Sequence, residues 1–225
     1  GRRLAALAGE LARQAADAAG EGRVRVAGSL PPLFGSYRPD LFDADRAPAL
    51  LAVLIEGLSP SVDLWLGETL GSSAEAEAAR RALPDDGKPL WISFTLKDED
   101  PDPARPCLRS GEPVEEAVAA SFELGAAAQL FNCSQPEVMS AAIGAARRAL
   151  GKAGRDLPIG VYANAFPPQD EEAEANSGLS PIRGDLGPPG YLAFVEDWVA
   201  RGATLVGGCC GIGPEHIAEL RRKLG

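Results

Sequence analysis

The sequence predicts an α/β fold in which helices alternate with the short strands of a parallel sheet. Short apolar segments alternate with longer segments of helical periodicity along nearly the whole chain. Strands separated by helices in this way form βαβ units, whose strands run parallel. Polar, glycine-rich and cysteine-bearing residues follow the strands at their carboxyl ends. Both α/β barrels and open doubly wound sheets carry their functional sites there, so this edge alone does not choose between the two.

Each expected strand is short and apolar enough to be covered on both faces. The six strands are expected at Arg23–Ala27, Val62–Leu66, Pro89–Phe94, Ala127–Phe131, Ile159–Tyr162 and Thr204–Val206. The helices are expected at Arg2–Ala19, Asp45–Leu58, Ser73–Leu83, Pro113–Leu124, Pro136–Leu150, Tyr191–Arg201 and Pro214–Leu224. A long polar loop, rich in proline and glycine, is expected between Ala165 and Pro189.

Composition places the chain among ordinary globular domains. It has 225 residues, of which 45% are hydrophobic and 24% charged, and we expect one domain spanning residues 1–225. The formal net charge of −10 argues against nucleic acid or an anionic membrane as a partner. No apolar run reaches the length of about 18 residues that a membrane span needs, and the first residues lack the apolar block of a secretory signal. We therefore expect a cytoplasmic protein.

Three of the four cysteines predict a metal site. Cys133 follows one expected strand, and the adjacent Cys209 and Cys210 follow the last strand, within Gly207–Gly211. In a barrel the carboxyl ends of all strands meet at one mouth, so the three sulfurs can converge to within about 4 Å. Thiolates favour zinc, and three protein ligands leave a fourth position open for water or substrate. Buried cysteines can also be mere packing residues, but packing does not require the flanking glycines. Cys107, in a proline-rich loop, is expected to be incidental.

The order of the motifs resembles that of the homocysteine S-methyltransferase family. The motifs are Asn132–Cys133, Gly207–Gly211 and Pro214–Ile217, supported by Val26–Leu30, Gly67–Leu70 and Phe131–Glu137. The family includes S-methylmethionine- and betaine-dependent enzymes and the homocysteine module of cobalamin-dependent methionine synthase. The resemblance runs from about residue 2 to the end of the chain, and the paired cysteines among glycines are its most specific part.

The resemblance implies a (β/α)8 TIM barrel that is incomplete here. A complete member has eight strand–helix units, and the first carries an Asp-Gly-Gly motif that this sequence lacks. The chain opens inside what resembles the helix after the second strand, so strands three to eight are expected to be present. Six strands cannot close such a barrel. We expect the two preceding units to belong to the protein but to be disordered; the alternative is that the protein is truncated before the third strand.

The resemblance also implies the chemistry. Zinc held by Cys133, Cys209 and Cys210 would bind the sulfur of L-homocysteine, which would take a methyl group from S-methylmethionine or a similar onium donor to form methionine. The physical reason is that a thiolate attacks and a protonated thiol does not, and a metal ion removes that proton at neutral pH. The expected partners are homocysteine and a small methyl donor, and the protein is expected to be a monomer or a small homo-oligomer.

Further residues are candidates for contacts with the substrate. Glu68 matches the family's acidic residue that binds the amino group of homocysteine, although an acid near a helix start is also favoured by the helix dipole. Backbone amides of the glycine loop, in particular those of Gly207 and Gly208, can take the substrate carboxylate. Asn132 and Asn164 lie at strand ends and orient ligands or are structural. His216, the only histidine, is expected to be solvated or to pack.

Two other functional hypotheses remain at this point. One is a non-catalytic barrel that binds zinc or thiols. The other is a zinc-thiolate methyltransferase that acts on another small thiol or a selenol. Methyl-transfer assays with several acceptors and donors separate these hypotheses from a homocysteine methyltransferase.

Overall fold

The computed structural model describes residues 1–20, 22–168 and 181–225, and six parallel strands form one sheet within them. The strands follow one another in sequence order and are β1 (Ala27–Leu30), β2 (Leu64–Leu70), β3 (Leu90–Phe94), β4 (Ala128–Asn132), β5 (Ile159–Tyr162) and β6 (Leu205–Val206). The helices are α1 (Arg2–Ala18), α2 (Ala47–Leu58), α3 (Ser73–Ala82), α4 (Val114–Glu123), α5 (Pro136–Lys152), α6 (Pro188–Ala200) and α7 (Pro214–Leu224), with short 3-10 turns at Pro39–Leu41 and Ser59–Ser61.

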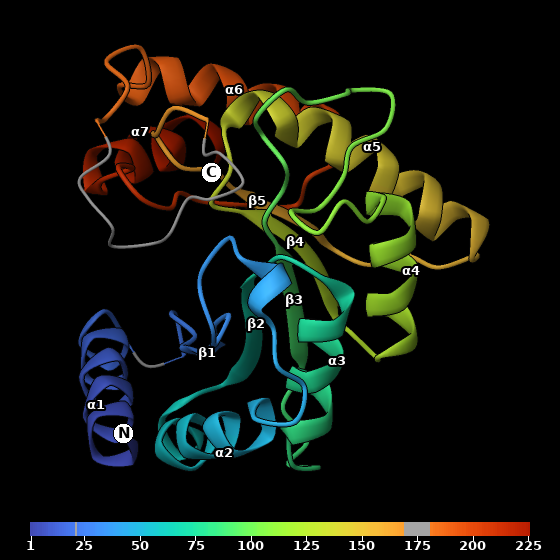
Figure 1. The fold of residues 1–225 in the computed structure, drawn as a ribbon. Coiled ribbons are helices and arrows are strands. Elements are labelled where there is room, and N and C mark those ends of the chain that lie inside the picture. The colour runs from blue at the N-terminus through green and yellow to red at the C-terminus, as the bar shows by residue number, and fades with distance from the viewer. Residues whose placement is uncertain (21, 169–180) are drawn as a thin grey trace.

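The sheet curves, and the helices lie along its outer side (Figure 1). Each pair of neighbouring helices along the chain from α1 to α7 is in contact. Within the described ranges, β1 and β6 do not pair with each other. The architecture is therefore an incomplete (β/α)8 barrel, as expected. None of the helices in the described part of the chain combines the length and the apolar character needed to cross a membrane.

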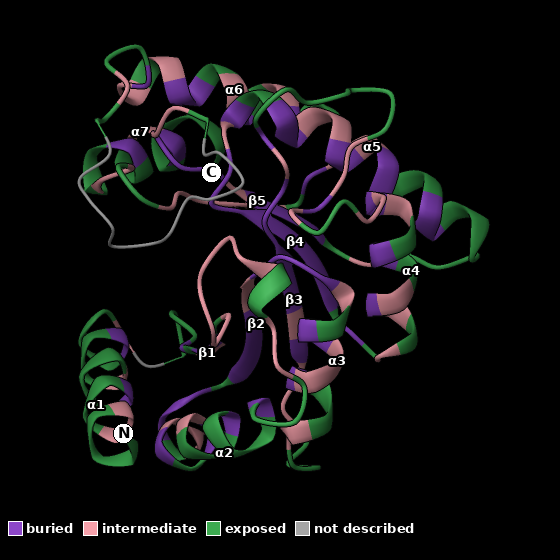
Figure 2. Ribbon diagram, viewed as in Figure 1, coloured by how far each residue is buried: buried purple, intermediate pink, exposed green. Residues whose placement is uncertain are grey.

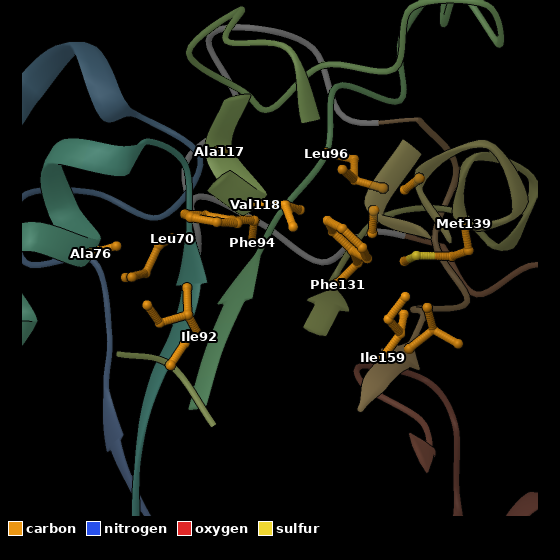
Figure 3. Packing of buried hydrophobic residues seen from close by; sticks show 14 of the residues in the cluster. Leu70, Ala76, Ile92, Phe94, Leu96, Ala117, Val118, Phe131, Met139 and Ile159 are labelled. Carbon is orange, nitrogen blue, oxygen red and sulfur yellow. The ribbon is translucent and has the colours of Figure 1, made fainter. Parts of the chain in front are cut away.

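The hydrophobic core lies between the sheet and the helices. Leu70, Ile92, Phe94 and Phe131 point from the strands into one cluster of buried side chains, where they meet apolar residues of α3, α4 and α5 (Figure 3). The central strands are largely buried and the outer surfaces of the helices are exposed (Figure 2). Alternate strand residues point to the opposite face, which leads to the mouth of the barrel.

Most of the expected bounds agree with the structure to within two residues, but two strands and the start of one helix differ more. The helix expected from Tyr191 begins three residues earlier, at Pro188. The first strand was expected at Arg23–Ala27, but β1 runs from Ala27 to Leu30. The reason is the neighbouring strand: β2 begins at Leu64, which pairs with Ala27, so the residues before Ala27 have no strand beside them. The second strand was expected to end at Leu66, but β2 continues to Leu70 and contains Glu68. The long loop expected from Ala165 to Pro189 lies partly outside the described residues, and its last two residues begin α6.

Candidate active site

The three predicted metal ligands lie together at the carboxyl ends of the strands. Cys133 follows β4, and Cys209 and Cys210 lie in the loop after β6. The three sulfur atoms lie within 4.8 Å of one another, close to the expected spacing, and those of Cys209 and Cys210 are 3.8 Å apart. In the described part of the chain, this is the one group of three or more Cys, His, Asp or Glu side chains with the spacing of metal ligands.

Backbone hydrogen bonds to β5 and the residues after it fix the position of the cysteine loop. The amide of Cys209 donates to the carbonyl of Ala163 over 2.9 Å, and the carbonyl of Cys210 accepts from the amide of Ala165 over 2.8 Å. Gly208 is needed because a Cβ atom there would collide with the side chain of Ile212. The glycine that the sequence places beside the cysteines therefore lets the loop turn back tightly toward α7.

The donor set fits a zinc ion. Tetrahedral zinc with Zn–S bonds of about 2.3 Å places its sulfur ligands about 3.8 Å apart, which is the separation of Cys209 and Cys210. Soft thiolates are the ligands that zinc prefers over harder cations such as magnesium. Cys133 is buried, whereas Cys210 is exposed, so one side of the cluster is open. That open side suits a fourth ligand that comes from solution.

The three thiols influence one another's ionisation. Hydrogen bonds from Cys133 and Cys209 lower the pKa of Cys210 to about 3. The hydrogen bond with Cys209 favours ionisation of Cys133, but the bond to Cys210 and burial outweigh it and raise the pKa of Cys133 to about 11. The hydrogen bond with Cys133 raises the pKa of Cys209 strongly. One negative charge thus rests on Cys210, and binding of a metal would release protons from the other two thiols.

Tyr37 is a neighbour of the cluster that the sequence did not single out. Its hydroxyl is hydrogen-bonded to the side chain of Cys133, and burial, followed by the electrostatic interaction with Cys133, raises the pKa of Tyr37. The hydroxyl therefore stays protonated and donates to the sulfur. The guanidinium of Arg109 lies over the ring of Tyr37, 5.0 Å from its centre. The sequence signal that could have identified Tyr37 is an aromatic residue in the loop after β1, at the carboxyl end of a strand.

Glu68 lies in the same mouth and is held by neutral donors. The hydroxyl of Ser29 donates to one carboxylate oxygen over 2.6 Å, and the hydroxyl of Tyr162 donates to the other over 3.2 Å. Burial, followed by the charge of Glu68, raises the pKa of Tyr162 well above its usual value, so the phenol remains a donor. Within the described residues no cationic side chain pairs with Glu68. The carboxylate is thus free to receive a cationic group from a ligand.

The two candidate asparagines differ in their contacts. The side-chain oxygen of Asn132 accepts from the hydroxyl of Ser93 over 2.7 Å and from the amide of Thr69 over 3.2 Å. Its side-chain nitrogen donates to the hydroxyl of Thr69 over 2.8 Å. In Asn164 the side-chain nitrogen is buried and has no partner in the described part of the chain. Asn132 is thus held mainly by protein groups, whereas Asn164 keeps a donor unused.

The glycine loop offers fewer free amides than its sequence suggests. The amide of Gly207 already donates to the carbonyl of Val161 over 3.1 Å. The amides of Gly208 and Gly211 donate to no group in the described ranges, so these two remain for a ligand.

His216 was expected to be solvated or to pack, and the structure shows that it packs, because its side chain is buried. One ring nitrogen accepts from the amide of Gly213 over 3.0 Å, and the other faces the carbonyl of Leu186 at 2.9 Å. A carbonyl only accepts, so Nε2 carries the proton that faces Leu186. His216 fixes the start of α7 and has no contact with the thiols. Cys107 also lies outside the cluster, and its thiol donates to the carbonyl of Arg105 over 3.2 Å.

Comparison with known proteins places these features in a family. A family model described as homocysteine S-methyltransferase matches residues 1–224. The homocysteine S-methyltransferase of Escherichia coli is 31% identical over an alignment 235 residues long. The alignment covers 95% of this chain and 69% of that protein. A selenocysteine Se-methyltransferase of Brassica oleracea is 27% identical over 172 residues, which cover 72% of this chain and 43% of that protein.

Among solved structures, the chain is similar to the apo form of the homocysteine methyltransferase MmuM from Escherichia coli. The TM-score is 0.70 and the identity 28%, and the match covers 98% of this chain and 72% of that one. The chain spans less than half the length of the plant relatives that it matches. The match of the family model over nearly every residue shows that the chain belongs to the homocysteine S-methyltransferase family.

Proposed function

We propose that the protein transfers a methyl group from S-methylmethionine or a similar onium donor to the thiol of L-homocysteine and forms methionine. The observation that carries this proposal is the convergence of the three cysteine sulfurs in one open cluster. Cys133, Cys209 and Cys210 would hold zinc. When bound, zinc supplies a Lewis acid that lowers the pKa of the acceptor thiol. In the reaction the acceptor sulfur bonds to the methyl carbon, the donor's sulfur–methyl bond breaks with its electron pair going to the donor sulfur, and the thiol proton goes to solvent.

The surroundings of the cluster support an amino acid as the acceptor. Glu68 offers a carboxylate whose protein partners are the neutral hydroxyls of Ser29 and Tyr162, which suits an ammonium group. The amides of Gly208 and Gly211 suit a carboxylate, because they lie just before the N-terminus of α7. A ligand held at both places would lie near the thiols, because Tyr162, which donates to Glu68, also interacts with Cys209.

A neighbouring cavity supports a polar methyl donor. Tyr37 and Arg109, which support the cluster, also line a cavity of about 750 Å³. Its wall carries charges of both signs, including Lys97 and Glu99. Such a wall suits a donor that carries both an ammonium and a carboxylate group, as S-methylmethionine does.

A selenol is the second acceptor candidate. Its basis is the similarity of the chain to plant proteins named selenocysteine methyltransferases. A selenol ionises more readily than a thiol, so it would need less activation by the metal.

Methyl transfer from labelled S-methylmethionine tests both proposals in the full-length, zinc-loaded protein. Labelled methionine formed from homocysteine supports the first proposal, and faster methylation of selenocysteine than of homocysteine supports the second. Zinc binding without transfer to either acceptor, with S-methylmethionine or other onium donors, would refute both and favour a non-catalytic thiol-binding barrel. A Cys210→Ala variant serves as the blank.

A further inference from the structure

Strand β2 contains a bulge at the residues that carry the candidate amine site. Gly67 pairs with Ile92 of β3, and Leu70 pairs with Phe94. Two residues of β2, Glu68 and Thr69, therefore lie opposite the single residue between Ile92 and Phe94. Bulges of this kind bend a strand and redirect a side chain, and they occur next to active sites more often than elsewhere.

The bulge allows one strand to serve the core and the site at once. Trp65 and Leu70 both lie in the helix-side core, although they are an odd number of residues apart. In a regular strand such a pair would point to opposite faces. Figure 3 shows Leu70 beside Ile92 and Phe94 in that core. The extra residue lets Leu70 point into the core while the Glu68 carboxylate still reaches the mouth.

The bulge holds Thr69 in an unfavourable conformation. Its φ angle is +61°, in the left-handed region that a β-branched side chain rarely adopts. Left without support, Thr69 would relax to an extended conformation and change the direction of Glu68, the residue before it.

Asn132, two strands away in the sheet, stabilises this conformation of Thr69. It lies on β4 and is only 1% exposed. Its side-chain oxygen accepts from the Thr69 amide over 3.2 Å, and its nitrogen donates to the Thr69 hydroxyl over 2.8 Å. Ser93, the residue opposite the bulge, donates to the same oxygen over 2.7 Å and fixes the orientation of the amide. These contacts hold both the backbone and the side chain of Thr69.

We propose that Asn132 is a positioning residue that determines specificity for acceptors with an α-amino group. It holds the bulge, and the bulge aims Glu68 at the substrate ammonium. The proposal rests on the proposed function in that Glu68 receives the amine of homocysteine. Asn132 then acts through Glu68 and makes no essential contact with the substrate.

An acceptor without the amino group separates this role from a general structural one. Asn132→Ala should raise the KM for homocysteine about tenfold or more, since a misplaced carboxylate loses a charge-assisted hydrogen bond. Its zinc content should remain at the wild-type level. For 4-sulfanylbutanoate, which is homocysteine without the amine, kcat/KM should be unchanged. An equal loss for both acceptors would overturn the proposal, because it would indicate damage to the whole site.

Two double variants test the route of the effect. Glycine adopts a positive φ freely, so Asn132→Ala combined with Thr69→Gly should recover part of the homocysteine KM. The double variant that combines Asn132→Ala with Glu68→Ala should raise the KM for homocysteine no more than Glu68→Ala alone. The reason is that both changes remove the same interaction, that of Glu68 with the substrate ammonium. Failure of the rescue together with additive losses would contradict the proposal. If Asn132→Ala does not fold, Thr69→Val removes one of the two contacts and should give the same amine-dependent loss.

The positioning role of Asn132 can be tested even if the proposed function is wrong. Absence of homocysteine turnover in the wild-type protein refutes that function by itself. A crystal structure of Asn132→Ala then decides the positioning claim. Displacement of the Glu68 carboxylate from Ser29 and Tyr162 supports the claim, and an unmoved carboxylate rules it out.

Discussion

The guanidinium of Arg109 lies 2.7 Å from the carboxylate of Asp98, and both side chains are shielded from solvent, with exposures of 3% and 0%. The other carboxylate oxygen of Asp98 accepts from the backbone N–H of Gln135 over 3.1 Å. Arg109 also covers the ring of Tyr37, whose hydroxyl is bonded to Cys133. This ion pair therefore connects the loop after β3 to the thiol cluster.

Removal of the charge on Asp98 is expected to destabilise the protein strongly. Asp98→Asn removes the carboxylate charge from this buried ion pair, and the loss of one charge from such a pair costs about 3–5 kcal/mol. In a chain of this size that loss lowers the midpoint of thermal unfolding by about 6 to 20 °C. Calorimetry checks the shift. Glu77→Gln, which breaks the exposed pair with Arg81, is the control and should change the midpoint by no more than about 2 °C. Similar shifts in the two variants would contradict the structural role of the buried pair.

Loss of any cluster cysteine should remove the metal. Cys133→Ala and Cys210→Ala each leave two thiols, so zinc bound at about one equivalent per chain in the parent should fall to a small fraction. Methyl transfer should be lost in parallel. Metal analysis of the purified variants gives the answer, with Cys107→Ser as the matched control because Cys107 lies outside the cluster. Full zinc retention in Cys133→Ala would rule out the proposed ligand set.

Two adjacent glycines should respond differently to the same substitution. A methyl group on Gly208 would collide with Ile212, whereas one on Gly207 would meet the Cβ of Tyr162 at an ordinary 3.6 Å. Gly208→Ala should therefore lower stability by about 1–3 kcal/mol and weaken zinc binding, because the cysteine loop must move. Gly207→Ala should leave both nearly unchanged. Denaturant unfolding and zinc titration measure the contrast, and equal behaviour of the two variants would refute it.

Glu68 should matter for the acceptor and not for the metal. Glu68→Gln keeps the shape of the side chain but removes its charge, and a hydrogen bond to a charged group contributes about 1.5–3 kcal/mol. Homocysteine should bind about 10- to 100-fold more weakly, while the zinc content stays constant. Calorimetric titration with homocysteine tests this expectation. Unchanged affinity would mean that the ammonium binds elsewhere.

The stabilising contribution of Asp63 should depend on pH. The amide of Val26 and the guanidinium of Arg13 hold the pKa of Asp63 below its usual 3.8. A lowered folded pKa means that the contribution is present above the unfolded value and is lost as the pH falls through the folded one. Asp63→Asn should thus lower the unfolding midpoint by a few degrees at pH 7, and the difference should shrink near pH 3. Asp45→Asn is the control, because it makes the same charge change at a carboxylate with no hydrogen bond or ion pair to the residues that the structure describes. It should show no such trend.

The thiol cluster could be predicted from the sequence because cysteine side chains are recognisable metal ligands. Two cysteines set among glycines after an apolar strand, with Cys133 after another, fix the ligand types, and parallel strands bring their ends together. The sequence does not mark Tyr37, Ser29 or Tyr162 as site residues. Only the fold brings Tyr37 to Cys133 and the other two to Glu68. Hydroxyl groups in otherwise apolar strands do not reveal which carboxylate they will contact.

The bulge illustrates what periodicity cannot predict. The segment Leu64–Leu70 is largely apolar, so its sequence does not say which neighbours face the core or where one extra residue enters. That register depends on β3 and on Asn132, a residue of β4. The same limit applies to β1, whose bounds follow from where β2 begins.

Because β6 is short, the structural order of the cysteine loop that follows it depends on other contacts. The strand contains only Leu205 and Val206, and within the described chain it pairs with β5 alone. Two of the three cluster sulfurs follow this weakly anchored strand. A metal ion shared with Cys133 would act as a cross-link between it and the well-buried β4, so metal affinity and order at the sheet edge would be linked. Removal of zinc should therefore appear first as faster amide hydrogen exchange at residues 205–210, before any change in β2 or β3.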